Sequence, residues 1–184
     1  MNDATPLPLI MSPRRFRQML KELHRRGQNR RESGAFLLGR RNAKPVAGGR
    51  EVTKIYYYDD LDPESLTGGI TMHASGLSLL NQRCRADQLR VIGDIHTHPS
   101  THVRQSAIDS NHPMIALPNH VALIAPNYAS GKISPTDLGA HQFLRGGQWD
   151  IAYGNDTTRM LRIRPAAILL LARLHRALLE RGTR

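Results

Sequence analysis

The segment Asp94-Ile95-His96-Thr97-His98-Pro99 closes a stretch, residues 90–98, that begins apolar and becomes polar. This pattern predicts a strand that leaves the core and ends at a polar site. Ser106-Ala107-Ile108-Asp109 follows after a short loop and predicts a short helix. The loop is short enough for the helix to fold back over the end of the strand.

This arrangement predicts a metal site. His96 and His98 are two residues apart on a strand, so both imidazoles leave the same face. Ser106 and Asp109 are three apart on a helix and also share a face. Two imidazoles and one carboxylate then converge, which matches the three protein ligands and open position of a catalytic zinc site.

Catalysis at such a site also needs a proton carrier. Zinc lowers the pKa of a bound water to about 7 and polarises a carbonyl, and a carboxylate that does not ligate the metal can accept the proton and pass it to the leaving amine. Glu32 is the best candidate, because it lies at the entrance to a predicted buried strand, residues 35–39. Ser106 can donate a hydrogen bond to the developing oxyanion, cap its helix, or do both.

The rest of the chain predicts helices and strands that alternate irregularly, with short loops. Helices are expected at residues 12–26, 72–88 and 165–181, the last with a stripe of Leu170, Leu171, Leu174 and Leu178; strands are expected at 52–58 and 121–125 and in a hairpin of 139–144 with 148–153. These elements predict one α/β domain of the mixed α+β type over residues 1–184.

Composition limits the classes of protein that this chain can represent. Its 184 residues, 40% hydrophobic and 22% charged, exclude a disordered or collagen-like chain. Cys84 is the lone cysteine, which excludes an intramolecular disulfide and suggests a small apolar filler. We find no signal peptide in residues 1–10, and the longest apolar run, residues 166–172, is too short to cross a bilayer. A cytoplasmic location without membrane contact is therefore expected.

The motif resembles that of the JAMM metalloproteases, the catalytic branch of the JAB/MPN family: His-x-His, seven residues, Ser, two residues, Asp. Upstream, Glu32-x-Gly34-x-x-Leu37-x-Gly39 is similar to the family's glutamate-bearing strand. The resemblance covers about residues 14–153. It implies a curved mixed β-sheet flanked by helices, to which a helix at about 165–182 is added.

The resemblance also implies a role for each motif residue. His96, His98 and Asp109 would ligate one Zn²⁺, Glu32 would position and deprotonate the water, and Ser106 would stabilise the tetrahedral intermediate. The implied reaction is that of a deubiquitinase-like isopeptidase, which hydrolyses the amide bond after the C-terminus of a ubiquitin-like protein. Residues 121–128 and 149–151 look similar to bacterial members, some of which are encoded in antiphage operons beside activating-like and conjugating-like enzymes. Enzymes of those two kinds are therefore implied partners.

The chain departs from the eukaryotic deubiquitinases of this family at two points. Those enzymes carry long insertions, whereas here the chain passes quickly from Asp109 to the strand near Val121. It also lacks the Cys cluster that holds a second zinc in one subgroup. A simpler substrate is therefore expected, either a tag on a target protein or a tag precursor, with its tail bound partly by β-augmentation.

Three alternatives remain open. A peptidase that matures a sulfur-carrier-type protein would use identical chemistry. A non-catalytic MPN scaffold is disfavoured because all five motif residues are present. A nucleic-acid-binding module could use the net charge of +11, but no helix-turn-helix or RNP-like signature accompanies it. The basic clusters near both ends are expected to be solvated helix faces or to dock an acidic patch.

Several other polar residues are expected to play lesser parts. His102, His112, His120 and His141 are expected in loops or on the surface, with His112 the nearest to Asp109 in sequence. Asp94 could orient a ligating histidine, or it could lie at the surface or the mouth of the site. Trp149 is expected to pack within the sheet.

Overall fold

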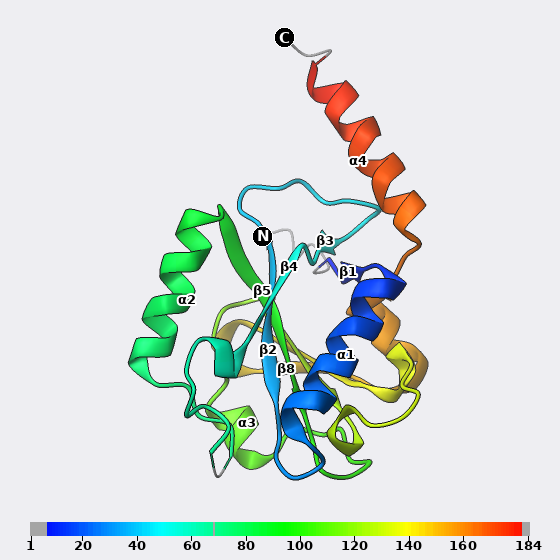
Figure 1. The fold of residues 1–184 in the computed structure, drawn as a ribbon. Helices are drawn as coiled ribbons and strands as arrows, with labels where there is room; N and C mark the ends of the chain where they lie inside the picture. Colours follow the sequence, from blue (N-terminus) through cyan, green and yellow to red (C-terminus); the bar gives the residue numbers. More distant parts are fainter. Residues whose placement is uncertain (1–6, 68, 182–184) are drawn as a thin grey trace.

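The computed structural model, which describes residues 7–67 and 69–181, is built around a mixed sheet (Figure 1). The strand order is β4-β2-β5-β6-β7-β8, and only the β5–β6 pair is parallel. The strands are β2 Gly34–Arg40, β4 Lys54–Tyr57, β5 Leu89–Thr97, β6 Val121–Ala125, β7 Gly139–Phe143 and β8 Trp149–Ala152. The predicted hairpin is confirmed as β7 and β8.

A second, smaller sheet joins short segments from distant parts of the chain. Its parallel strands, in the order β3-β1-β9, are β1 Leu9–Met11, β3 Arg50–Glu51 and β9 Leu161–Ile163. None of these three strands is predicted from the sequence, and the strand predicted at 52–58 is the shorter β4. Segments of two or three residues show no recognisable period, so only their pairing reveals them.

All the predicted helices are confirmed, with small shifts at their ends. They are α1 Pro13–Gly27, α2 Ala74–Ala86, α3 Ala107–Asn111 and α4 Ala166–Arg181. Short 3₁₀ helices occupy Tyr58–Asp60, Asn127–Ala129, Pro135–Asp137, Arg145–Gly147 and Gly154–Arg159. Helix α1 begins as predicted, since the Ser12 hydroxyl accepts a hydrogen bond from the Arg15 amide (3.3 Å) and Pro13 follows.

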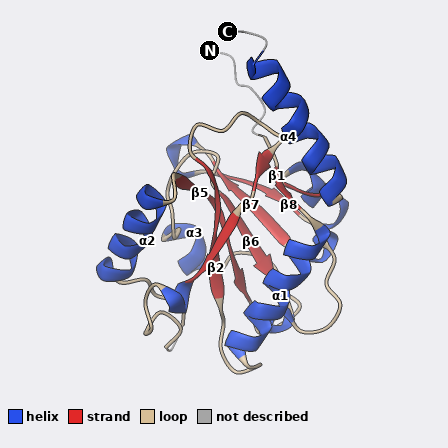
Figure 2. Ribbon diagram, turned by 45° about the horizontal axis from the view of Figure 1, so that its top comes forward, coloured by secondary structure: helices blue, strands red, loops and turns tan. Residues whose placement is uncertain are grey.

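The helices cover both faces of the main sheet, with α1 on one side and α2 and α3 on the other (Figure 2). Strand β2 is buried on both faces: Ala35 and Leu37 pack in the cluster that includes α1, while Phe36 and Leu38 pack in the cluster that includes α2. This explains its continuous apolar run. Cys84 is buried in the α2 cluster, as predicted. The mixed α/β fold class is confirmed.

Helix α4 projects away from the sheet (Figure 1). Leu169 is buried against Ile10 and Val46, whereas the predicted leucine stripe is exposed at Leu170, Leu171, Leu174 and Leu178. Within the described residues, no helix has the length and apolar character needed to cross a membrane.

Candidate metal centre

The ends of two strands fix the backbone of both motif histidines. His96 lies on β5 between Gly34 of β2 and Ile124 of β6. His98 follows the strand, and its amide donates to the Ala125 carbonyl (2.9 Å). The His98 Nδ1–H donates to the His102 carbonyl (3.0 Å), which leaves Nε2 with a lone pair for a metal. His102 therefore contributes its backbone, not its side chain.

Helix α3 carries Asp109 to the same place. The Ser106 amide donates to Asp109 Oδ2 (2.8 Å), and the Asp109 amide donates to Ser106 Oγ (3.1 Å). This reciprocal pair of hydrogen bonds is a capping box with Ser106 as the N-cap. The predicted role of Ser106 as a helix cap is therefore confirmed. The same contacts orient the Asp109 carboxylate toward the end of β5.

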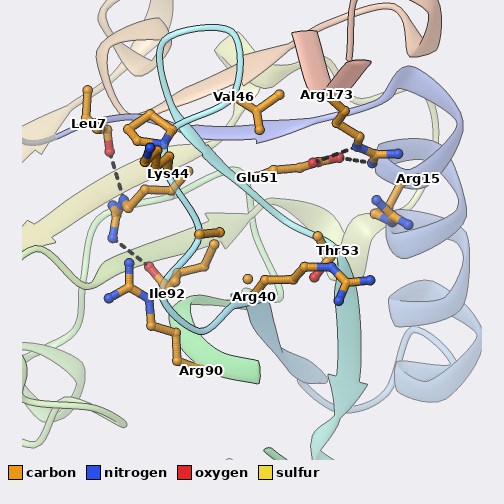
Figure 3. A pocket seen from close by; sticks show the side chains of 14 residues that line it. Leu7, Arg15, Arg40, Lys44, Val46, Glu51, Thr53, Arg90, Ile92 and Arg173 are labelled. Atoms are coloured by element: carbon orange, nitrogen blue, oxygen red, sulfur yellow. Dashed lines mark hydrogen bonds and ion pairs between the residues drawn. The ribbon is translucent and has the colours of Figure 1, made fainter. Parts of the chain in front are cut away.

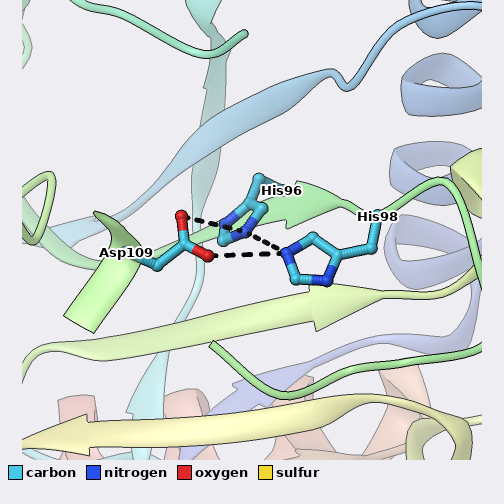
Figure 4. A group of neighbouring side chains, drawn as sticks. All are labelled: His96, His98 and Asp109. Atoms are coloured by element: carbon cyan, nitrogen blue, oxygen red, sulfur yellow. Dashed lines mark hydrogen bonds and ion pairs between the residues drawn. The ribbon is translucent and has the colours of Figure 1, made fainter. Parts of the chain in front are cut away.

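His96, His98 and Asp109 are brought together (Figure 4). The two Nε2 atoms are 3.1 Å apart, Asp109 Oδ1 is 3.8 Å from His96 Nε2, and Asp109 Oδ2 is 3.5 Å from His98 Nε2. A tetrahedral zinc with ligands at 2.0–2.1 Å requires ligand atoms about 3.3 Å from one another. The two Nε2 atoms are close to that spacing, and the two Asp109 oxygens, each measured to a different histidine, are slightly farther away. The three side chains are therefore grouped so that they could hold a metal ion.

Burial and neighbouring charges shift the pKa values of these three groups in different directions. Burial alone would lower the pKa of His98, but its hydrogen bonds with Asp109 and the His102 carbonyl, and the Glu32 charge, raise it. Burial lowers the pKa of His96, which favours the neutral imidazole that a metal needs. Burial alone would raise the pKa of Asp109, but the hydrogen bond with His98 and the charge of His96 hold it well below its usual range. Asp109 is therefore a carboxylate at neutral pH.

Glu32 lies across from His98. The Ser33 amide donates to Thr97 Oγ1 and the Thr97 amide donates to the Ser33 carbonyl, each at 2.9 Å. Because Gly34 is opposite His96, this register puts Glu32 opposite His98 and on the same face. Burial raises the pKa of the half-buried Glu32; the His98 charge opposes this shift and the Asp109 charge adds to it. A carboxyl with a raised pKa is suited to proton transfer.

A buried hydrogen-bonded chain supports the site from behind. The Tyr58 hydroxyl donates to Asp94 Oδ2 (2.9 Å), and His120 Nε2 donates to Asp94 Oδ1 (2.5 Å). A Cβ atom on Gly34 would lie 2.3 Å from the Tyr58 ring, so glycine at this position is what admits the tyrosine. These contacts fix the Asp94 carboxylate, which is two residues before His96 on β5.

Several expectations about the other polar residues were wrong. Asp94 is buried, so it is not at the surface or the mouth, and its hydrogen bonds go to Tyr58 and His120, not to a motif histidine. His120 and His141 are also buried. His120 directly precedes β6 and His141 lies within β7. This proximity to apolar strands is the only sign of burial in the sequence, and it is too weak to predict burial by itself.

Two residues near the metal centre, His112 and Trp149, are not among its converging ligands. His112 lines a small cavity of about 70 Å³ with His96 and Asp109 but is not one of the converging ligands. Trp149 packs edge-on against Phe143, as expected, and its indole N–H donates to the Ser110 carbonyl at 3.2 Å. Trp149 thus ties α3 to β8.

Gly139 is needed for the loop that joins the two halves of the centre. A Cβ atom at this position would lie 1.9 Å from the Val103 carbonyl oxygen, a backbone atom of that loop. We expect Gly139→Ala to destabilise the fold by about 1–3 kcal/mol and to lower zinc affinity. Gly27→Ala is the matched control, since its Cβ would meet nothing closer than 3.6 Å. Thermal melts and zinc titrations should separate the two variants; equal behaviour would contradict this role.

Comparison with known proteins identifies relatives of the fold only. No family model matches the chain. The solution structure of protein DSY2949 from Desulfitobacterium hafniense is similar, with a TM-score of 0.57 and 19% identity over 86% of this chain and 96% of that chain. A protein from Salinibacter ruber gives a TM-score of 0.52 and 16% identity, over 87% and 94% of the two chains. At these identities the likeness defines a shared mixed α/β fold.

Proposed function

We propose that this protein is a zinc-dependent isopeptidase or peptidase of the JAMM type, which hydrolyses the amide bond after the C-terminus of a ubiquitin-like protein. The observation that carries the proposal is the convergence of His96, His98 and Asp109 at ligand spacing. Glu32, on the neighbouring strand and opposite His98, supplies the additional carboxylate that amide hydrolysis requires.

Each motif residue has a task in the proposed reaction. His96, His98 and Asp109 would hold a Zn²⁺ ion, which would supply a water of lowered pKa and polarise the carbonyl. Glu32 accepts the proton from the attacking water and transfers it to the nitrogen of the leaving amine. Ser106 Oγ already accepts the Asp109 amide hydrogen, so its own hydroxyl hydrogen is available to donate to the carbonyl oxygen as that oxygen gains charge.

The short connection after α3 favours a small tag as the substrate. Residues 112–120 are all that separate α3 from β6, and Ile115 and Met114 within them pack against the α2 cluster. No long insertion is present there to hold a second ubiquitin unit. A ubiquitin-like protein on a target, or its precursor, is the substrate that we propose; co-encoded activating-like and conjugating-like enzymes of a bacterial antiphage system are the proposed partners.

A tag fusion tests this function. A ubiquitin-like protein fused through its terminal glycine to a C-terminal peptide should be cut directly after that glycine by the zinc-loaded protein, as read by intact mass. The same tag joined to a lysine side chain distinguishes deconjugation from precursor maturation. A sulfur-carrier precursor in parallel tests the alternative substrate. Cleavage at scattered sites would instead identify a general protease, and no cleavage of any fusion would refute the proposal.

A further inference from the structure

A second cavity, distant from the metal centre, has a strongly positive lining. A cavity of about 450 Å³ is lined by six basic side chains and one carboxylate, that of Glu51 (Figure 3). Strand β2 runs from Gly34, beside His96, to Arg40, which lines this cavity. Arg40 is six residues from Gly34 along the strand. At about 3.3 Å per residue, the cavity is therefore about 20 Å from the metal centre.

Arg50 is the feature of this cavity that most needs explanation. Its Nε donates to the Leu7 carbonyl (2.9 Å) and its Nη1 to the Ile92 carbonyl (3.3 Å). Its Nη2 is buried and, among the described residues, has no hydrogen-bond partner. A buried donor left without an acceptor is costly, and a charged one more so. Burial, with the charge of Arg90 nearby, lowers the pKa of Arg50 to about 10.

Within the described part of the chain, two of the other arginines around the cavity have hydrogen-bond or ion-pair partners, and two do not. Arg15 donates to the Val52 carbonyl (2.7 Å), and Arg173 forms an ion pair with Glu51. For Arg40 and Arg90, the described residues provide no hydrogen-bond or ion-pair acceptor. Arg90 extends toward the Ile92 carbonyl and the Arg50 side chain, whereas Arg40 extends to the other side, toward Thr53 (Figure 3). The charge of Arg90 acts on Arg50, and two neighbouring cations favour an anion beside them.

The shape of the cavity narrows the class of anion. Its volume falls within the range of small-molecule sites, about 300–1,000 Å³. Leu7, Val46 and Ile92 give it an apolar wall beside the charged one. An arginine fork matches phosphate oxygens, each of which accepts more than one N–H. Arg50, which carries the buried Nη2, is one of the residues that line the cavity. A terminal phosphate of a compact molecule can enter such a cavity more easily than the backbone of a long polyanion.

We propose that this cavity binds a small metabolite with a terminal phosphate, which accepts hydrogen bonds from Arg50 and Arg90, while its organic part lies against Leu7, Val46 and Ile92. This site is separate from the metal centre and does not depend on the hydrolase activity. We name it the arginine pocket, defined by those five residues.

Titration calorimetry at constant ionic strength tests the arginine pocket. The probes are inorganic phosphate and adenosine 5′-monophosphate, with adenosine as the uncharged control. Saturable binding of one phosphate or monophosphate per chain is expected, and none of adenosine. Tighter binding of the monophosphate than of inorganic phosphate would show that the organic part is also recognised; equal binding would assign the site to phosphate itself. Both results support the pocket.

Three variants separate the pocket from other sources of binding. Arg90→Gln should weaken binding by about tenfold or more; the Arg90 side chain is exposed enough for the fold to tolerate the change. Arg17→Gln, an exposed residue of α1 outside the pocket, removes the same charge and should change little. His98→Ala should retain binding, because the pocket is not the metal centre. Equal losses in Arg17→Gln and Arg90→Gln, loss in His98→Ala, or no saturable binding would each overturn the proposal.

Discussion

Glu32→Gln should reduce the rate of tag cleavage by about 10²–10⁴-fold, the usual contribution of a positioned acid–base group. Glutamine has nearly the shape of glutamate and cannot carry the proton. Glu32 is not among the converging ligands, so the variant should still hold its metal. The expected result is therefore a folded, zinc-loaded protein that does not turn over.

The measurements for this variant are single-turnover cleavage of the tag fusion and zinc content by elemental analysis. Glu64→Gln is the matched control, because Glu64 is exposed and outside the metal centre, and its rate should equal that of the unaltered protein. Full activity in Glu32→Gln would remove Glu32 from the role of base. Loss of zinc in this variant would instead place Glu32 among the ligands.

His98→Ala should abolish both zinc binding and cleavage. The unaltered protein is expected to contain about one zinc per chain. Substituting residues that only orient a ligand typically costs 10–100-fold in metal affinity, so removing one of three ligands should cost more than about 100-fold. Only about 13% of the His98 side chain is exposed, but it lies beyond the end of β5, so the sheet should survive the change.

His112→Ala is the control for this second prediction. His112 is near Asp109 and lines the same small cavity, but it is not one of the converging ligands. The variant should keep its zinc and most of its activity. Zinc loss in His112→Ala would mean that the ligand set is different from the one proposed. Absence of zinc from the unaltered protein, after expression with zinc supplied, would contradict the metal assignment as a whole.

The parts of the site that could be predicted depend on short-range geometry. A strand places His96 and His98 on one face because its side chains alternate, and a helical turn relates Ser106 to Asp109. The structure has the expected elements at both places. Glu32 is a candidate because its segment precedes a recognisable buried strand and resembles the glutamate-bearing strand of the family, and the pairing of β2 with β5 puts it opposite His98.

The amino-acid sequence therefore indicates the local elements and the order of the chemical groups along them. The pairing of β1, β3 and β9 is visible only in the folded chain, because strands of two or three residues carry no period and their partners are distant in sequence. The folded chain also buries Asp94 and His120 as a pair. The arginine pocket belongs to the same category. Arg50 and Arg90 look like ordinary surface charges in the sequence, and a buried donor without an acceptor arises only when separate strands enclose it.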